Sequence, residues 1–143
     1  MASRGNPSRR PSMNAAIVDT DVVSMLFKGD TRALPYRSHI TGRLLGISFM
    51  TLAELERWSL ERNWGQRREL ELAQHLTRYT VLPVSRELCA KWAEVSFAAK
   101  RLGRPIQTAD AWIAASALHY RVPLITNNRG DYSVVDGLTL LSA

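Results

Sequence analysis

Four acidic residues of this 143-residue chain stand where carboxylates can do chemistry. Each follows an apolar run or lies near the start of a helical pattern: Asp19, Glu54, Asp110 and Asp131. Several anions at one place repel one another unless a cation offsets their charge, and oxygen-only ligation favours Mg²⁺ or Mn²⁺ over zinc. A carboxylate-bound metal beside a phosphate can activate water and stabilise the leaving oxygen. The pattern therefore favours hydrolysis of phosphodiester bonds.

The strands that would position these acids are short apolar runs, which alternate with segments of helical periodicity. Continuous apolar runs are typical of parallel strands buried on both faces, so the alternation predicts an α/β fold with a mostly parallel central sheet and helices on both faces. The runs cover residues 15–18, 44–50, 80–84 and 122–126. A shorter run at 138–141 is predicted to be an edge strand.

The predicted helices lie between these runs. Two helices, broken near 63–65, are predicted between residues 54 and 79, and a third is predicted over 85–102. The third has an apolar face, expected to pack against the sheet, at helical spacing: Leu88, Trp92, Val95, Ala99 and Leu102. A fourth helix is predicted to run to Tyr120 with Thr108 as its N-cap.

The four acids are predicted to converge at one edge of the sheet. Ligands of parallel sheets bind beyond the carboxyl ends of the strands. Asp19 ends the first strand, Glu54 lies in the first turn of the helix after the second, and Asp131 follows the fourth. Asp110 lies in the first turn of a helix that must end at the opposite edge, where the fourth strand begins. The N-terminus of this helix, and Asp110 with it, therefore lies at the carboxyl edge. Because two helices separate strands three and four, the first of them cannot run straight down the sheet.

Each acid also has a purely structural explanation. Thr51 and Glu54 match a capping box, and Asp110 complements the dipole of its helix. Asp19 can cap the helix after the first strand, and Asp131 fits an ordinary turn. Capping does not require four anions at one edge, however, so a metal site is favoured for the set as a whole.

Composition and charge restrict the class of protein. Of the residues, 45% are hydrophobic, and no apolar run is long enough for a membrane helix or a signal peptide, so a cytoplasmic protein is expected. The net charge is +6, and residues 1–14 contribute three arginines and no acid. This segment is predicted to be a disordered tail that precedes one domain over 15–143. Cys89, the single cysteine, excludes an internal disulfide and is expected to be buried.

The motifs around the four acids resemble those of PIN-domain ribonucleases, specifically the VapC toxins of bacterial toxin–antitoxin pairs. The matching segments are Ile17–Asp21, Thr51–Leu55, Thr108–Ala117 and Leu124–Tyr132. The resemblance implies a three-layer domain in which the four acids are catalytic and hold Mg²⁺ or Mn²⁺: Asp19, Glu54, Asp110 and Asp131. It implies that Thr126 and Asn128 shape the last loop. It further implies an RNA substrate, a homodimer and a cognate antitoxin protein.

The chain departs from the family's pattern at three positions. Asp21 stands where the family often has Asn or Ser. It is predicted either to add an anion near the metal or, as we favour, to be a solvent-facing cap. Asn127 replaces a frequent Arg, and Tyr132 replaces a more usual Phe. Both changes leave the carboxylates intact, and any effect is expected on substrate choice.

A basic and aromatic segment follows the second predicted strand. Arg57 and Arg62, interleaved with Trp58 and Trp64, are candidate contacts to RNA phosphates and bases. The alternative is equally open: Arg57 pairs with Glu61 on the helix surface, and the tryptophans pack against the core or a partner helix.

Two other functions remain open. Asp19 and Asp21 also fit the nucleophile and general acid of a haloacid dehalogenase-type phosphatase. The chain is short for that fold with a cap, and Glu54 would have no role in it. The second alternative is a PIN-like module that binds RNA or a partner protein without catalysis, and the intact acidic set argues against it.

Overall fold

The computed structural model describes residues 14–143. The tail predicted for residues 1–14 therefore lies outside the described residues, except for Asn14. The carbonyl of Asn14 accepts a hydrogen bond from the Leu44 amide (2.9 Å), which continues the pairing of the first two strands.

One parallel sheet forms the centre of the molecule, as the alternation of runs predicted. Its strand order is β3-β2-β1-β4-β5, and every neighbouring pair in it is parallel. The strands are β1 (Ala15–Val18), β2 (Leu44–Ser48), β3 (Thr80–Leu82), β4 (Leu124–Ile125) and β5 (Leu140–Leu141). The last run therefore forms an edge strand, and β1 lies in the middle with its carboxyl end directed to one edge.

Four strands, β2 to β5, are shorter than the apolar runs that predicted them, and β2 and β3 end early for local reasons. The run at 44–50 leaves the sheet after Ser48, because the Ser48 hydroxyl accepts a hydrogen bond from the Met50 amide (3.0 Å) and starts a helix. The run at 80–84 leaves the sheet at Leu82, and the next residue, Pro83, has no amide hydrogen with which to continue the ladder.

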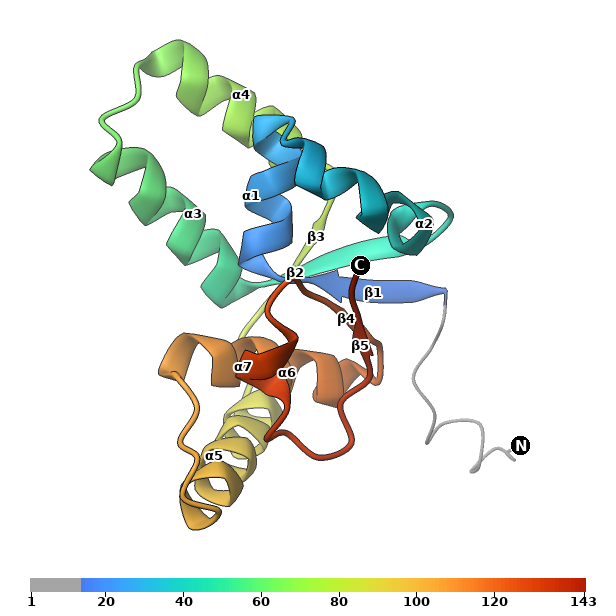
Figure 1. The fold of residues 1–143 in the computed structure, drawn as a ribbon. Coiled ribbons are helices and arrows are strands. Elements are labelled where there is room, and N and C mark those ends of the chain that lie inside the picture. Colours follow the sequence, from blue (N-terminus) through green and yellow to red (C-terminus); the bar gives the residue numbers. More distant parts are fainter. Residues whose placement is uncertain (1–13) are drawn as a thin grey trace, which may run out of the picture.

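Helices cover both faces of the sheet, so the fold has three layers (Figure 1). One side carries α1 (Thr20–Lys28), a 3₁₀ helix (Thr31–Tyr36), α2 (Arg37–Ile40), α3 (Phe49–Glu61) and α4 (Gln66–Leu76). The other side carries α5 (Arg86–Arg101), α6 (Thr108–Tyr120) and α7 (Arg129–Tyr132). Successive residues of β1 point to opposite faces, so Ala16 and Val18 join one apolar core and Ile17 joins the other.

The packing of α5 differs from the prediction. Helix α6 lies between α5 and the sheet (Figure 1) and is buried over most of its length, so the apolar face of α5 packs mainly on α6. Leu102, expected on that face, is 66% exposed. With α5 set away from the sheet, the loop after Gly103, whose positive φ of 71° suits glycine, returns the chain to the carboxyl edge where α6 begins.

Two predicted helix starts are wrong. Helix α3 begins at Phe49 with Ser48 as its N-cap, so Thr51 and Glu54 lie inside the helix and form no capping box. Helix α6 begins at Thr108 itself, with Gln107 as its N-cap. The structural explanation for Glu54 is thereby removed, and its carboxylate is available for other contacts.

Three further expectations concern local structure and surface. The break near 63–65 is confirmed, because α3 ends at Glu61 and α4 begins at Gln66. Cys89, expected to be buried, is exposed on α5. Within residues 14–143, none of the helices combines the length and the apolar composition needed to cross a bilayer.

Candidate metal site

Asp19 lies at the carboxyl end of β1 and is the buried centre of the site, with 4% of its surface exposed. As N-cap of α1, its Oδ1 accepts a hydrogen bond from the Thr20 amide (2.8 Å). Its Oδ2 accepts one from the hydroxyl of Thr126, which follows the neighbouring strand β4 (2.7 Å). The Thr126 hydroxyl in turn accepts a hydrogen bond from the Asn128 amide (3.0 Å). Adjacent strand ends therefore fix the orientation of this carboxylate.

Glu54 is brought to Asp19 by a threonine that the sequence analysis did not single out. The Thr20 hydroxyl donates a hydrogen bond to Glu54 Oε1 (2.7 Å) and lies 2.9 Å from the Thr51 hydroxyl. These contacts join the start of α1 to α3. The position of Thr20 between two aspartates of the first motif is the signal that could have identified it.

Asp21 combines the two roles considered for it. Its Oδ1 accepts a hydrogen bond from the Val22 amide in the first turn of α1 (2.7 Å), which is a capping contact. Its Oδ2 accepts from the side-chain amide of Asn128 (2.9 Å) and the backbone amide of Asn127 (3.2 Å). Asp21 is half-buried rather than directed to solvent, and it lines the same cleft as Asp19. It therefore adds an anion to the site.

Asp110 lies in the first turn of α6, on the opposite layer from α1 and α3. The hydroxyl of Tyr132, a residue that is 1% exposed, donates a hydrogen bond to Asp110 Oδ1 (3.3 Å). The same hydroxyl interacts with Asp19 and offsets part of the rise that burial causes in the Asp19 pKa. Tyr132 thus links two carboxylates from different layers, a contact that a phenylalanine at this position could not make.

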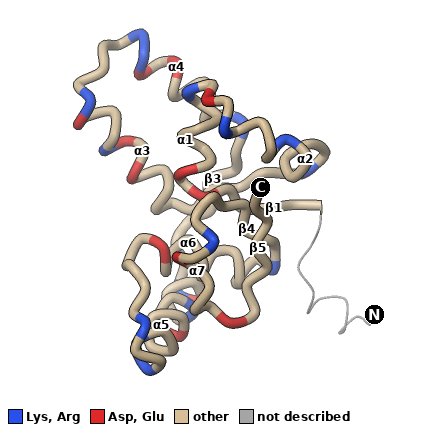
Figure 2. Tube along the Cα trace, in the orientation of Figure 1, with Lys and Arg blue, Asp and Glu red and all other residues tan. Residues whose placement is uncertain are grey.

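Four carboxylates line one cleft of about 340 Å³: Asp19, Asp21, Glu54 and Asp110. Figure 2 shows acidic positions of α1, α3 and the α6–α7 region around the middle of the molecule, with basic positions toward the outer ends of α3 and α4. Asp131 is exposed on α7 and lines an adjoining hollow of about 280 Å³, which shares Asp110 with the cleft. The structure therefore brings three of the four predicted acids together and places the fourth at the rim.

Burial and mutual repulsion make three of these carboxyl groups hard to ionise: Asp19, Asp21 and Asp110. Burial, assisted by the charge of Asp21, raises the pKa of Asp19 from 3.8 to about 7. Burial and the charges of Asp19 and Asp131 raise the pKa of Asp110 to about 6. Burial also raises the pKa of Asp21. A cation among these groups would favour their charged forms, so the electrostatics of the cleft suit a positive ligand.

The donor set fits a hard divalent cation. Among residues 14–143, the His, Cys, Asp and Glu side chains form no ready-made cluster of three metal ligands. Mg²⁺ usually takes only one or two carboxylates and completes its octahedral shell with waters and substrate phosphates. Two carboxylates of this cleft therefore meet its requirement, whereas a structural zinc site would need four protein ligands.

The two arginines predicted to contact RNA have different surroundings. Arg57 forms an ion pair with Glu61 on the exposed side of α3 (Nε to Oε2, 3.7 Å), as the alternative predicted. The Arg62 guanidinium lies over the ring of Trp58, 6.0 Å from its centroid. Trp58 itself lines the acidic cleft and meets Trp64 edge-on, with ring centroids 4.7 Å apart. Both tryptophans pack against the apolar core, and Trp58 also borders the site.

This chain belongs to the PIN domain family, whose model matches residues 16–138. That span includes all four predicted acids and every strand except β5 and the first residue of β1, Ala15. The three-layer α/β fold with a parallel sheet, predicted from the sequence, is confirmed.

Relatives and solved structures agree with this assignment. Ribonuclease VapC1 of Haemophilus influenzae strain R2866 is 29% identical over 126 residues, which cover 85% of this chain and 92% of the relative. VapBC2 from Rickettsia felis bound to a promoter DNA fragment aligns with a TM-score of 0.80 and 19% identity, covering 90% of this chain and 98% of that one. VapBC-1 from nontypeable Haemophilus influenzae aligns with a TM-score of 0.74 and 26% identity, covering 90% and 97%.

Proposed function

We propose that this PIN-domain protein is a Mg²⁺- or Mn²⁺-dependent endoribonuclease that acts as the toxin of a toxin–antitoxin pair. One observation carries the proposal: Asp19, Glu54 and Asp110 meet at the carboxyl edge of the sheet, with Asp131 beside them. None of the four forms a salt bridge within residues 14–143. A relative named as a ribonuclease and a structural neighbour described as a toxin–antitoxin complex support the same conclusion.

In the proposed mechanism four acids at the carboxyl edge would hold a divalent cation: Asp19, Glu54, Asp110 and Asp131. A bound divalent cation supplies the charge that activates a water molecule and stabilises the developing negative charge at the phosphate. The Thr126 hydroxyl orients Asp19, and the Thr20 hydroxyl orients Glu54. The hydroxyl of Tyr132 holds Asp110 toward Asp19. These donors fix the carboxylates before substrate binds, so little reorganisation is needed during the reaction.

The proposed partners follow from the same assignment. The substrate is RNA, a polyanion that suits a chain of net charge +6. The cognate antitoxin protein inhibits the chain, and two copies of the chain form a homodimer. Because the substrate is cellular RNA, we place the activity in the cytoplasm.

The phosphatase alternative loses its support. It requires Asp21 as a general acid next to a nucleophilic Asp19. Instead, Asp21 accepts three hydrogen bonds, including two from the loop after β4, and Glu54 is held beside Asp19 by Thr20. The match to the PIN domain family over residues 16–138 assigns the chain to a different class.

Cleavage of RNA tests the proposal. The purified chain is incubated with end-labelled total RNA and with a synthetic single strand, in Mg²⁺, in Mn²⁺ and in EDTA, beside the Asp110→Asn variant and a generic phosphatase substrate. We expect cleavage that requires the metal and disappears in the variant. Binding of RNA without cleavage in every condition would indicate the non-catalytic module, and release of phosphate from the small substrate alone would restore the phosphatase.

A further inference from the structure

Trp58 is the aromatic residue that borders the acidic cleft. It lies four residues after Glu54 on α3, so the two side chains share one face of the helix. The same cleft of about 340 Å³ is lined by Trp58, Glu54 and Asp19. A ligand that places a phosphate among the carboxylates would therefore carry its neighbouring groups onto this ring.

The position of the Trp58 ring is fixed by other aromatic rings. Phe27, from α1, meets it edge-on with ring centroids 6.3 Å apart, and Trp64 does the same at 4.7 Å. Phe27 also contacts Trp64 (5.7 Å) and the buried His75 (5.7 Å). A ring held in this way loses little conformational entropy when a ligand stacks on it.

Two cationic side chains lie over this ring. Lys28 Nζ is 5.6 Å and the Arg62 guanidinium is 6.0 Å from the ring centroid of Trp58. Neither forms a salt bridge with a carboxylate of residues 14–143, whereas Arg57 on α3 and Arg67 on α4 are each paired with a glutamate. Both cationic side chains are exposed and flexible, so each can turn to a phosphate and leave the ring to a base.

An RNA strand needs such a feature to enter this cleft. The carboxylates repel the RNA backbone, so cationic groups must hold the phosphates next to the reacting one. Unpaired bases offer open faces that stack on aromatic side chains, whereas the bases of a duplex are already stacked. The combination at this end of the cleft matches a single-stranded nucleotide with its phosphates.

We propose that Trp58, Lys28 and Arg62 form a subsite that holds an unpaired nucleotide next to the scissile phosphate. Trp58 stacks on the base, and the two cations bind the flanking phosphates. The subsite rests on the proposed ribonuclease function, since it names how the same cleft receives its substrate. Arg57, a candidate RNA contact from the sequence, lies outside it.

Binding measured without metal separates the subsite from catalysis. A short single-stranded RNA containing 2-aminopurine is titrated with the full chain in EDTA over a range of salt concentrations. Lys28→Gln and Arg62→Gln should each weaken binding about three- to tenfold and each reduce the magnitude of the salt slope by about 0.7. Arg57→Gln and Arg67→Gln, which remove the same charge from ion-paired residues, should change the affinity by less than about twofold. Equal losses in all four variants would overturn the subsite and leave only general electrostatic attraction.

The base contact is tested with Trp58→Leu and Trp58→Phe. The 2-aminopurine fluorescence, quenched on stacking, should recover in Trp58→Leu with an affinity loss of about tenfold, and Trp58→Phe should retain most of both signals. Because Trp58→Leu removes a packed ring, its fold is checked by circular dichroism, and Trp58→Phe provides the test if the leucine variant unfolds. Unchanged quenching in folded Trp58→Leu would overturn the proposal, as would complete loss of quenching in folded Trp58→Phe or equal affinity for duplex RNA.

Two further outcomes are distinct. If RNA binds at this subsite and no condition gives cleavage, the ribonuclease assignment fails while the subsite stands. If the variants bind RNA normally but lose binding to the cognate antitoxin protein, the surface is a protein contact and the nucleotide subsite is wrong.

Discussion

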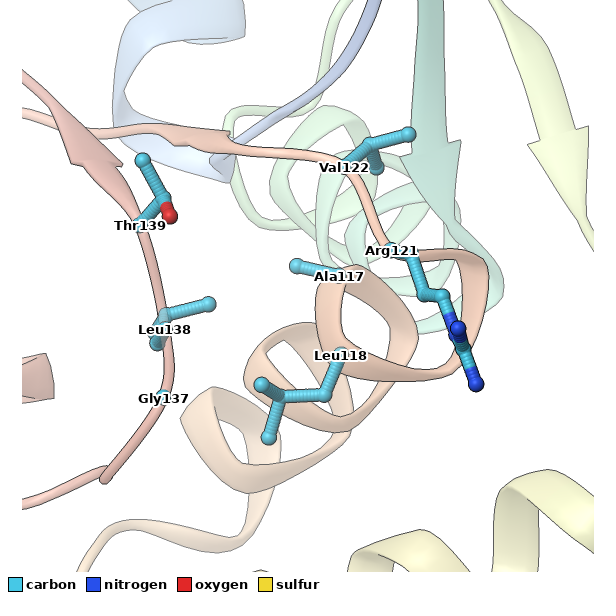
Figure 3. A pocket seen from close by; sticks show the side chains of 7 residues that line it. All are labelled: Ala117, Leu118, Arg121, Val122, Gly137, Leu138 and Thr139. Atoms are coloured by element: carbon cyan, nitrogen blue, oxygen red, sulfur yellow. The ribbon is translucent and has the colours of Figure 1, made fainter. Parts of the chain in front are cut away.

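The two edges of the sheet carry hollows of similar size, but only the hollow at the carboxyl edge is lined by acidic side chains. At the amino edge, a hollow of about 260 Å³ lies between the end of α6 and the segment that enters β5. Figure 3 shows apolar side chains such as Leu118 and Leu138 around it, with Arg121 pointing away. At the carboxyl edge, the cleft of about 340 Å³ is lined by carboxylates, and burial raises the pKa values of Asp19 and Asp110.

The difference lies in whether polar groups are satisfied locally. At the amino edge, the Arg121 and Val122 amides donate hydrogen bonds to carbonyls in the last turn of α6 (3.3 and 3.1 Å). These backbone groups at the end of the helix therefore have hydrogen-bond partners within the chain. At the carboxyl edge, like charges face one another across two layers, an arrangement that costs stability unless a cation is bound. In this protein, a hollow therefore indicates a metal site only where the carboxylates that line it lack a compensating positive charge. The following predictions test this contrast between the two edges.

The largest effect is expected from removing one charge of the cleft. Asp19→Asn and Asp110→Asn should each reduce RNA cleavage about a thousandfold. At about pH 8 without metal, each should also raise the free energy of unfolding by about 1–3 kcal/mol, because a buried charge is lost. Cleavage assays and urea unfolding in EDTA measure the two effects. A variant that is both inactive and less stable would indicate a structural role instead.

A smaller effect is expected from the hydroxyl that links the layers. Tyr132→Phe should weaken Mn²⁺ binding about tenfold, because the donor that orients Asp110 is lost. The ring remains, so the thermal midpoint without metal should change by only a few degrees. Calorimetric titration and a thermal melt provide the two readings. Unaltered metal affinity would show that Tyr132 acts through packing alone.

The pH dependence of stability should separate the cleft from the rest of the fold. His75 lies against Tyr79 (Nε2 to hydroxyl, 2.9 Å), and burial lowers its pKa from 6.5 to about 4. The unfolded chain then binds this proton more readily, so stability falls as pH drops from 6.5 toward 4, by about 1 kcal/mol per pH unit. The raised pKa values of Asp19 and Asp110 act in the opposite sense and weaken the metal-free fold as pH rises from about 4 to 7.

Urea unfolding across this range resolves the two contributions. Between about pH 4 and 6 the opposing contributions overlap, so His75→Gln should steepen the loss of stability with rising pH, and Asp19→Asn should reduce that loss up to about pH 7. An identical profile in either variant would assign that pH dependence to other groups.

The smallest effect on activity is expected at the amino edge. Thr139→Val and Leu118→Ala alter the lining of that hollow. RNA cleavage should stay within about twofold of the unsubstituted chain, and Leu118→Ala should cost about 1–2 kcal/mol of stability from lost apolar burial. Single-turnover cleavage and urea unfolding test this. A large loss of activity in folded Thr139→Val would remove the contrast between the two edges.

The sequence predicts the arrangement of the sheet better than the helix contacts. Apolar runs locate the strands and predict a mostly parallel sheet, because buried parallel strands need continuous apolar residues, whereas the strand order was not predicted. The packing of α5 on α6 was not predictable from the spacing of Leu88 and Val95, since an apolar helix face does not reveal which partner covers it. For the same reason the exposure of Cys89 was missed.

The site shows the same division between local pattern and tertiary contact. The convergence of Asp19, Glu54 and Asp110 follows from topology, because strands and helices of this class meet at one edge. The donors that orient these groups, Thr20 and Tyr132, could not be assigned from spacing, because each contact joins residues from different elements.

The most direct measurement is calorimetric titration of Mn²⁺ into the purified chain, carried out in two buffers of different ionisation enthalpy. Binding should be saturable, should release protons near neutral pH because the pKa values of Asp19 and Asp110 are raised, and should be lost in Asp19→Asn. Absence of binding in the folded chain, or equal binding in Asp19→Asn, would contradict a metal site at the carboxyl edge of this sheet.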